Sequence, residues 1–171
     1  MRYAAIVGAG MVLATSVTMA AASDWREKYK EIGFGVIPVE TQTQTSNTMD
    51  GFAAYASKKL GVPVKILTAT EFIGINNALV ACQIQMAWTS PSAYAGTWLD
   101  CKACVEPLVT ATDKDGNLGY NSVLIVKADS PYKTVEDLTG KNVARTEPNS
   151  QSGFLVPTVE FAKMGKPVET Y

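Results

Sequence analysis

The alternation of short apolar runs with amphipathic stretches is the feature of this sequence that most restricts its fold. Runs typical of buried strands occur at 34–39, 64–67, 86–88, 105–109, 122–126 and 142–145. Apolar residues at helical spacing occur at 49–60, 75–86 and 153–164, and a capping-box pattern opens a short helix at 134–140. Because strands that alternate with helices pair in parallel, the pattern predicts an α/β fold with a largely parallel sheet.

The first 22 residues have the pattern of an export signal. Arg2 is followed by a long stretch without charge, and the small residues Ala20 and Ala22 suit a signal-peptidase site. We expect cleavage after Ala22, with cleavage after Ala20 as the alternative. An uncleaved membrane anchor is less favoured because polar residues at 15–18 interrupt the apolar stretch. The mature protein is therefore expected in an exported, disulfide-permissive compartment.

Charge and histidine content exclude several classes of function. The chain has 15 Lys and Arg against 16 Asp and Glu, and it has no His. A nucleic-acid binder needs a basic face, which this balance does not supply. The absence of His removes His-based catalytic triads and imidazole metal sites. We therefore expect no nucleic-acid partner, no metal and no cofactor.

Cys101 and Cys104 form a CxxC pattern with two readings. A redox-active pair needs a thiolate stabilised by a helix start, and the segment 105–107, which contains a proline, is a poor helix opening. A structural disulfide that closes a small loop is favoured over a redox catalyst or half of a metal site. Cys82 lies on the apolar stripe of its helix and is predicted to be a buried free thiol.

Residues 149–153 contain the strongest candidate for a binding site. The run Asn-Ser-Gln-Ser-Gly follows a predicted strand and opens a predicted helix, where backbone N–H groups lack partners and the helix dipole is positive. An ordinary serine N-cap explains the same pattern. No Lys or Arg occurs at 31–57 or 66–101, so an anion bound here would be held by neutral donors. The uncharged polar run at 41–48 is either a solvated loop or the lining of a polar cleft.

The chain resembles the periplasmic substrate-binding proteins of phosphate, phosphite and phosphonate ABC transporters. The matching pieces appear in family order over nearly all of the chain after the signal. They are FGVIP at 34–38, LGVP at 60–63, AW at 87–88, GYNSVLIV at 119–126, DSP at 129–131, DLTG at 137–140 and EPNSQSGFLVP at 147–157.

The resemblance implies a type II periplasmic binding protein fold, a two-lobed clamp that closes on its ligand. Lobe one, mostly present, would occupy 23–121 after the signal peptide at 1–22. A hinge-crossing strand would follow at 122–128. Residues 129–171 would be the start of an incomplete lobe two, because family members are longer and the chain stops just after Val168 opens another apolar run. We interpret this as a C-terminal truncation.

The resemblance also implies a ligand site. Tyr120 and Ser150 would donate to the oxygens of a phosphonate, with Gln151 and Ser152 beside them in the same turn. Gln151 stands where the family usually has Thr, and Phe72 where it has a Tyr contact, so specificity for phosphonate is not fixed by these residues.

The implied function is solute binding without chemistry for an importer of phosphonate, phosphate or phosphite. The implied protein is a periplasmic monomer that serves a cognate permease and ATPase of the inner membrane. The alternatives are a periplasmic thiol-disulfide protein that uses Cys101 and Cys104, or a non-functional fragment of a binding protein.

Overall fold

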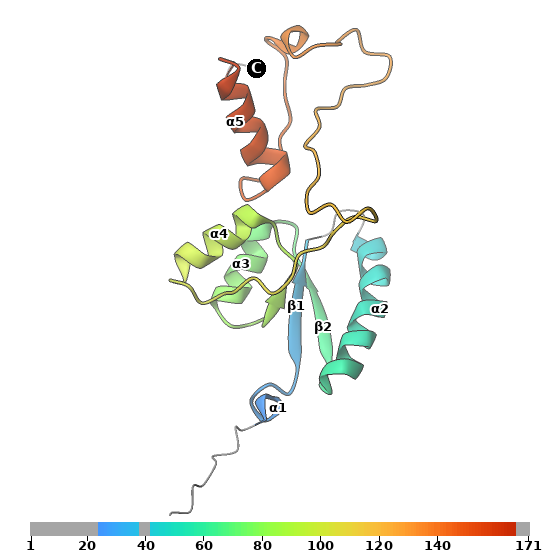
Figure 1. Ribbon diagram of the computed structural model, residues 1–171, viewed down its shortest axis with the longest axis vertical. Helices are drawn as coiled ribbons and strands as arrows, with labels where there is room; N and C mark the ends of the chain where they lie inside the picture. Colours follow the sequence, from blue (N-terminus) through green and yellow to red (C-terminus); the bar gives the residue numbers. More distant parts are fainter. Residues whose placement is uncertain (1–23, 38–41, 167–171) are drawn as a thin grey trace, which may run out of the picture.

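The computed structural model describes residues 24–37 and 42–166, and it divides into a lower body with a small sheet and an upper body that ends in a helix (Figure 1). The expected signal peptide at 1–22 and the apolar run at Val168 lie outside the described residues. The strands are β1 (Ile32–Val36), β2 (Val64–Thr68) and β3 (Met86–Ala87). The α-helices are α1 (Trp25–Lys28), α2 (Gln42–Leu60), α3 (Phe72–Val80), α4 (Pro91–Asp100) and α5 (Val156–Lys163).

The three strands form a parallel sheet in the order β2-β1-β3. Ile32 of β1 is opposite Val64 of β2, and Phe34 is opposite Met86 of β3. Each strand is followed by a helix that returns along the sheet, with α2 on one side and α3 and α4 on the other (Figure 1). The prediction of an α/β fold with a parallel sheet is confirmed.

The two faces of β1 pack in different ways. Ile32, Phe34 and Val36 are buried in the cluster that lies under α2, where the ring centroids of Phe34 and Phe52 are 4.8 Å apart. The opposite face presents Gly33 and Gly35, so the side chains of a second cluster, centred on Ile75, Ala78 and Ile84, pack directly against backbone. Alternation along a strand explains this division, because successive residues point to opposite faces.

Helix α2 begins seven residues earlier than the apolar spacing predicts, and it includes most of the uncharged polar run. The hydroxyl of Thr48 donates to the carbonyl of Gln44 at 3.1 Å, and that of Ser57 donates to the carbonyl of Ala53 at 2.7 Å. Such bonds to the preceding turn satisfy a hydroxyl without breaking the helix. The run from Gln42 onward is therefore helical, and a solvated loop is not formed there.

Helix α3 ends at Val80, well before Met86, the last residue expected in it. Cys82 follows with a φ of 56°, and the N–H groups of Gln83 and Ile84 both donate to the carbonyl of Ala78. The left-handed residue turns the chain into β3 and points Cys82 outward. The prediction that Cys82 is buried is wrong: it is a free and exposed thiol.

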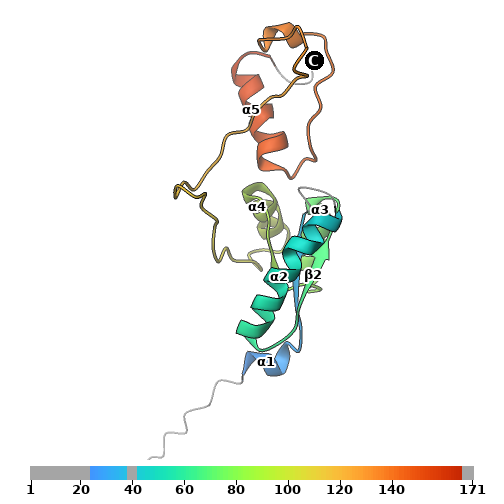
Figure 2. The same ribbon diagram turned by 90° about the vertical axis from the view of Figure 1, so that its right-hand side faces the viewer.

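Three predicted strands are absent from the described residues. The segments 105–109, 122–126 and 142–145 have strand-like sequences but no ladder partner, and the chain between α4 and residue 136 contains no helix or strand. A strand needs a neighbouring strand that exchanges backbone hydrogen bonds with it. A β-branched sequence favours extended backbone, but it does not supply that neighbour. The chain between α4 and residue 136 leads from the lower body to the upper one (Figure 2).

The upper body is small and partly confirms the predicted helices. A 3₁₀ helix, η1 (Glu136–Leu138), replaces the predicted helix at 134–140. The Asp137 carboxylate accepts from the N–H groups of Lys133 and Thr134, which lowers the pKa of Asp137 below its usual range. The helix predicted at 153–164 starts earlier, as a π-helical turn, η2 (Gln151–Leu155), that continues into α5.

Gly153 allows a close approach within this body. The N–H of Thr146 donates to the carbonyl of Gly153 at 3.1 Å, and a Cβ at Gly153 would lie 2.6 Å from Cγ2 of Thr146. In the described ranges, none of the helices combines the length and the apolar character needed to cross a membrane.

The glycine face of β1 generates a stability prediction. A Cβ at Gly35 would lie 2.7 Å from Cδ1 of Ile84 and 2.9 Å from Cγ2 of Ile75. Since overpacking a core costs about 1–3 kcal/mol, Gly35→Ala should lower the free energy of unfolding by that amount in a urea titration. Gly51→Ala is the matched control, because the new Cβ meets nothing within 4 Å in mid-helix. It should stabilise the chain by up to about 1 kcal/mol. Equal stability of Gly35→Ala and the unsubstituted chain would contradict the close packing.

The unpaired segment generates a second prediction. Val123 and Ile125 are 73% and 82% exposed. Exposed apolar surface binds dyes and promotes association, so the double change Val123→Thr with Ile125→Thr should lower dye fluorescence and light scattering. The free energy of unfolding should change by less than about 0.5 kcal/mol, as for other surface positions. The swap Val123→Ile with Ile125→Val retains the apolar surface and should leave both signals unchanged. A large loss of stability in the threonine variant would show that the segment is packed.

Candidate anion-binding site

The carboxyl ends of the three strands lie at the same edge of the sheet. The chain leaves β1 toward β2 on one side, and returns past β1 to β3 on the other, so the connections diverge between β1 and β3. Such a switch point is where open parallel sheets bind ligands. The N-termini of α2, α3 and α4 all follow strand ends at this edge, and each contributes a partial positive charge.

Helix α4 begins at this edge with two serines. Ser90 is the N-cap: its side-chain oxygen accepts from the N–H of Ala93 at 3.1 Å, and Pro91 occupies the first helical position. The hydroxyls of Ser90 and Ser92 donate to the backbone carbonyl of Asn149, at 2.9 and 2.6 Å. The start of α4 therefore contacts the turn that leads into η2, as the adjacent ends of α4 and the α5 segment indicate in Figure 1.

The turn from Ser150 to Gly153 begins η2, the helical turn that continues into α5. Ser150 is its N-cap, and its hydroxyl oxygen accepts from the N–H of Gly153 at 3.2 Å. An oxygen that accepts this bond still has its own proton to donate. The carbonyl of Ser150 accepts from the N–H of Leu155 at 3.1 Å, which closes the π-helical turn.

Two side chains from the crossing segment reach the same turn. The hydroxyl of Tyr120 donates to Oγ of Ser152 at 2.9 Å. The hydroxyl of Ser122 donates to the carbonyl of Ser152 at 2.6 Å. The crossing segment is thus attached to Ser152 at alternate residues, once through a hydroxyl and once through a backbone carbonyl.

Two fixed charges near the turn differ in how fully they are paired. Oε2 of Glu147 accepts from the N–H and from Nδ2 of Asn149, at 2.9 and 3.2 Å, while its Oε1 is buried without a hydrogen-bond partner among the described residues. Nη1 of Arg145 donates to Oγ1 of Thr158 at 2.8 Å, and the guanidinium lies 4.4 Å from the ring centroid of Phe154. The donors at the helix starts are therefore neutral hydroxyl and amide groups, and the Glu147 charge in the same turn opposes a strongly bound anion.

The structure brings four of the residues that the sequence suggests to one turn and places the fifth at the edge of the sheet. Ser150, Gln151 and Ser152 are consecutive and half-buried at the start of η2, and Tyr120 reaches them. Phe72 is the first residue of α3, at the same edge of the sheet, and its phenyl ring has no hydroxyl to donate.

Ser90 and Ser92 are not among the site residues that the sequence suggests. Their sequence signal is a serine followed by proline, which is typical of a helix start. Helix α4 was itself missed. That Asn149 lies against it depends on tertiary structure and has no sequence signal.

Cys101 and Cys104 are joined by a disulfide, with their Cα atoms 5.4 Å apart. Cys101 is the C-cap of α4, at the opposite end of that helix from Ser90. A helix C-terminus carries partial negative charge, which disfavours a thiolate. The pair therefore lies away from the candidate site and in the wrong electrostatic environment for an activated nucleophile.

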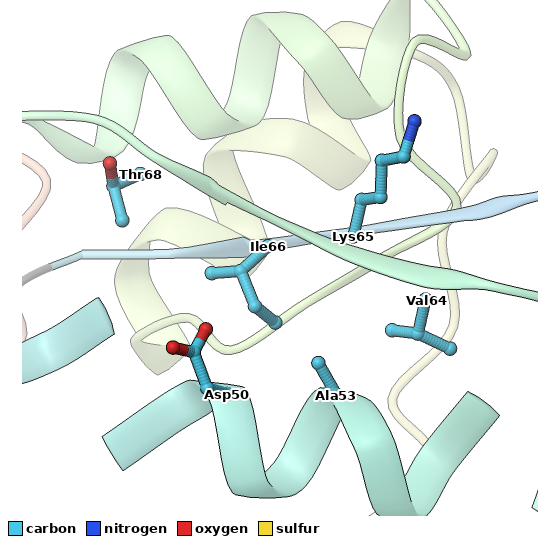
Figure 3. A pocket seen from close by; sticks show the side chains of 6 residues that line it. All are labelled: Asp50, Ala53, Val64, Lys65, Ile66 and Thr68. Carbon is cyan, nitrogen blue, oxygen red and sulfur yellow. The ribbon is translucent and has the colours of Figure 1, made fainter. Parts of the chain in front are cut away.

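A hollow also lies between α2 and β2 (Figure 3). It is lined by both polar and apolar side chains, and Lys65 points away from α2, the helix that carries Asp50. Nζ of Lys65 lies 2.6 Å from Oε2 of Glu31 and is paired there. The hollow has none of the converging donors found at the start of α4 and η2. In the described part of the chain, no group of three or more His, Cys, Asp or Glu side chains could hold a metal ion.

Comparison with known proteins identifies the family of this chain. A family model described as the phosphonate ABC transporter periplasmic substrate-binding protein matches residues 34–171. The phosphonates-binding periplasmic protein of Escherichia coli is 35% identical over 135 residues, which are 77% of this chain and 39% of that protein. The phosphate-import protein PhnD of Mycolicibacterium smegmatis is 28% identical over 136 residues, which are 78% and 42% of the two chains.

Two solved structures are also similar to this chain. The binding-protein component of an ABC phosphonate transporter from Pseudomonas aeruginosa superposes with a TM-score of 0.72 at 30% identity, over 82% of this chain and 48% of that one. PhnD1 from Prochlorococcus marinus, solved with methylphosphonate, has the same fold, with a TM-score of 0.62 at 20% identity, over 82% and 53% of the two chains.

The chain spans about 40% of the length of the curated relatives it matches. Its fold is that of a periplasmic binding protein, α/β with a parallel sheet, and it covers about half of the solved chains. The match of the family model to residues 34–171, which is most of the sequence, is the basis for the assignment. The chain belongs to the family of phosphonate ABC transporter periplasmic substrate-binding proteins.

Proposed function

We propose that this chain is the solute-binding component, or part of one, of an ABC importer for a small phosphorus oxyanion: phosphonate, phosphate or phosphite. It binds its ligand without chemistry and works in the periplasm with a cognate permease and ATPase. The relatives named for phosphonate and phosphate binding support the ligand class. The export signal expected at 1–22 supports the location.

The observation that carries this proposal is the convergence of hydroxyls on one helix start. The hydroxyl oxygens of Tyr120 and Ser152 are 2.9 Å apart, at the turn that Ser150 caps. An oxyanion at this point would receive hydroxyl protons, backbone N–H groups and the positive end of the helix dipole. Neutral donors release a ligand readily, which suits a transport protein that must deliver its cargo.

The proposed division of the chain rests on the resemblance to the family. In it, residues 23–121 belong to lobe one, 122–128 cross between the lobes, and 129–171 begin lobe two. The disulfide of Cys101 and Cys104 closes the end of α4, and we assign it a structural role before the chain enters the crossing segment.

The ligand site is tested by calorimetric titration. Phosphate, phosphite, methylphosphonate and 2-aminoethylphosphonate are titrated into the chain. At least one should bind, with a dissociation constant in the micromolar range or weaker, because the donors are neutral and the Glu147 carboxylate lies in the same turn. Ser150→Ala and Tyr120→Phe should each weaken binding by about 10–100-fold, since a hydrogen bond to a charged group contributes about 1.5–3 kcal/mol.

Matched controls exist within the same chain. Ser130 also accepts a backbone N–H, from Tyr132 at 3.1 Å, outside the turn. Ser130→Ala and Tyr132→Phe should therefore leave the affinity unchanged. If Ser150→Ala costs about 1 kcal/mol of stability and leaves binding intact, Ser150 is only a helix cap and the site assignment is wrong. If none of the four oxyanions binds, the proposed function fails.

The role of the disulfide is tested by an insulin-reduction assay. We expect no turnover, and no difference between the unsubstituted chain and Cys101→Ser, because a cysteine at a helix C-terminus lacks thiolate stabilisation. Cys82→Ser is the control, since it removes the exposed free thiol and leaves the disulfide intact. Turnover that disappears in Cys101→Ser would overturn the structural role and support a thiol oxidoreductase.

A further inference from the structure

We propose that Ser90 and Ser92, the serine pair, are positioning residues that hold the ligand-binding turn in place through the carbonyl oxygen of Asn149. The role in ligand binding rests on the proposed function. The mechanical role, which fixes the turn 149–153 against α4, does not depend on it.

The first step of the argument is the geometry at one oxygen atom. The hydroxyl of Ser90 donates to the Asn149 carbonyl at 2.9 Å, and that of Ser92 donates to it at 2.6 Å. A carbonyl oxygen has two lone pairs, so these two donors occupy both. The serine oxygens are 3.0 Å from each other, so both hydroxyls approach the carbonyl from the start of α4.

The second step is that two further polar groups of Asn149, its N–H and Nδ2, are also held. Its N–H and Nδ2 donate to the Glu147 carboxylate at 2.9 and 3.2 Å. Its Oδ1 faces Gly96 of α4, where a Cβ would meet it at 3.8 Å. Asn149 is therefore anchored to its own turn on one side and to α4 on the other.

The third step is electrostatic. Asn149 directly precedes Ser150, the N-cap of η2, while the serine pair is at the start of α4, so two positive helix ends lie close together. Such ends repel unless a negative group lies between them. The Asn149 carbonyl supplies that partial negative charge, and it brings Ser150 and Ser152 to a defined distance from the edge of the sheet.

The fourth step separates Ser92 from Ser90. Ser90 also caps α4 by accepting from the N–H of Ala93, so its removal would weaken the helix itself. Ser92 lies inside the first turn of α4 and donates to Asn149 without a capping role. Ser92→Ala therefore removes one of the two hydrogen bonds to the turn and leaves the cap intact.

The mechanical role is tested by amide hydrogen exchange, measured on the full chain without ligand. In Ser92→Ala, the amides of 150–155 should exchange about three- to tenfold faster, as expected for the loss of one hydrogen bond. The amides of α4 serve as an internal reference and should not change. Ser92→Thr, which keeps the hydroxyl, should restore the slow exchange, and Ser130→Ala should leave it unaffected.

The outcomes are distinct. Unchanged exchange at 150–155 in Ser92→Ala would overturn the positioning role. Equally faster exchange in α4 and the turn would also overturn it, because Ser92 would then act on stability alone. Faster exchange confined to the turn supports the role, even if the unsubstituted chain binds no oxyanion and the proposed function fails.

The consequence for binding is measured with the oxyanion that binds the unsubstituted chain most tightly. Ser92→Ala should weaken its affinity about tenfold although Ser92 does not belong to the proposed ligand donors. Ser92→Thr should recover it. An affinity that stays unchanged while the turn exchanges faster would overturn the claim that the serine pair serves ligand binding.

Discussion

Strand β1 is hydrogen-bonded on both sides, and the rest of the structure depends on this central pairing. Because β2 and β3 flank it in parallel, their carboxyl ends are brought to one edge, and the helices that follow must begin there. The strand has an apolar face under α2 and a glycine face under Ile75 and Ile84. The glycines let the second cluster approach the backbone, and this sets how closely α3 and the chain after it lie to the sheet.

The parts of the fold that the sequence predicts well have local causes. Residues 64–67 form a strand because their apolar, β-branched pattern coincides with a partner already in place, β1. The start of α2 was misplaced because hydroxyl and amide side chains bond either to solvent or to their own helix, and periodicity does not distinguish the two. The segment 122–126 has a stronger β-branched pattern than β3, yet only β3 is paired. Strand formation therefore depended on the neighbour more than on propensity.

The candidate site, too, is predictable from the sequence only where its causes are local. Ser150 to Gly153 could be identified from sequence because a serine before a helix has a recognisable pattern, and Tyr120 from the resemblance to the family. The contact between Ser92 and Asn149 spans 57 residues and involves a backbone carbonyl, which no side-chain pattern records. Cys82 was predicted to be buried from its helical spacing, but the helix ends before that spacing applies.

The chain has an odd number of cysteines, and this bears on which disulfide forms when it is oxidised. Cys82 is exposed and competes for either member of the native pair. Cys101 and Cys104 are three residues apart, while Cys82 is separated from Cys101 by the whole of β3 and α4. Closing a ring of a few residues costs less chain entropy than closing a ring of many residues. The native bond therefore has a statistical advantage in the unfolded chain, and the thiol left over is on the surface, where it offers a single point for covalent attachment.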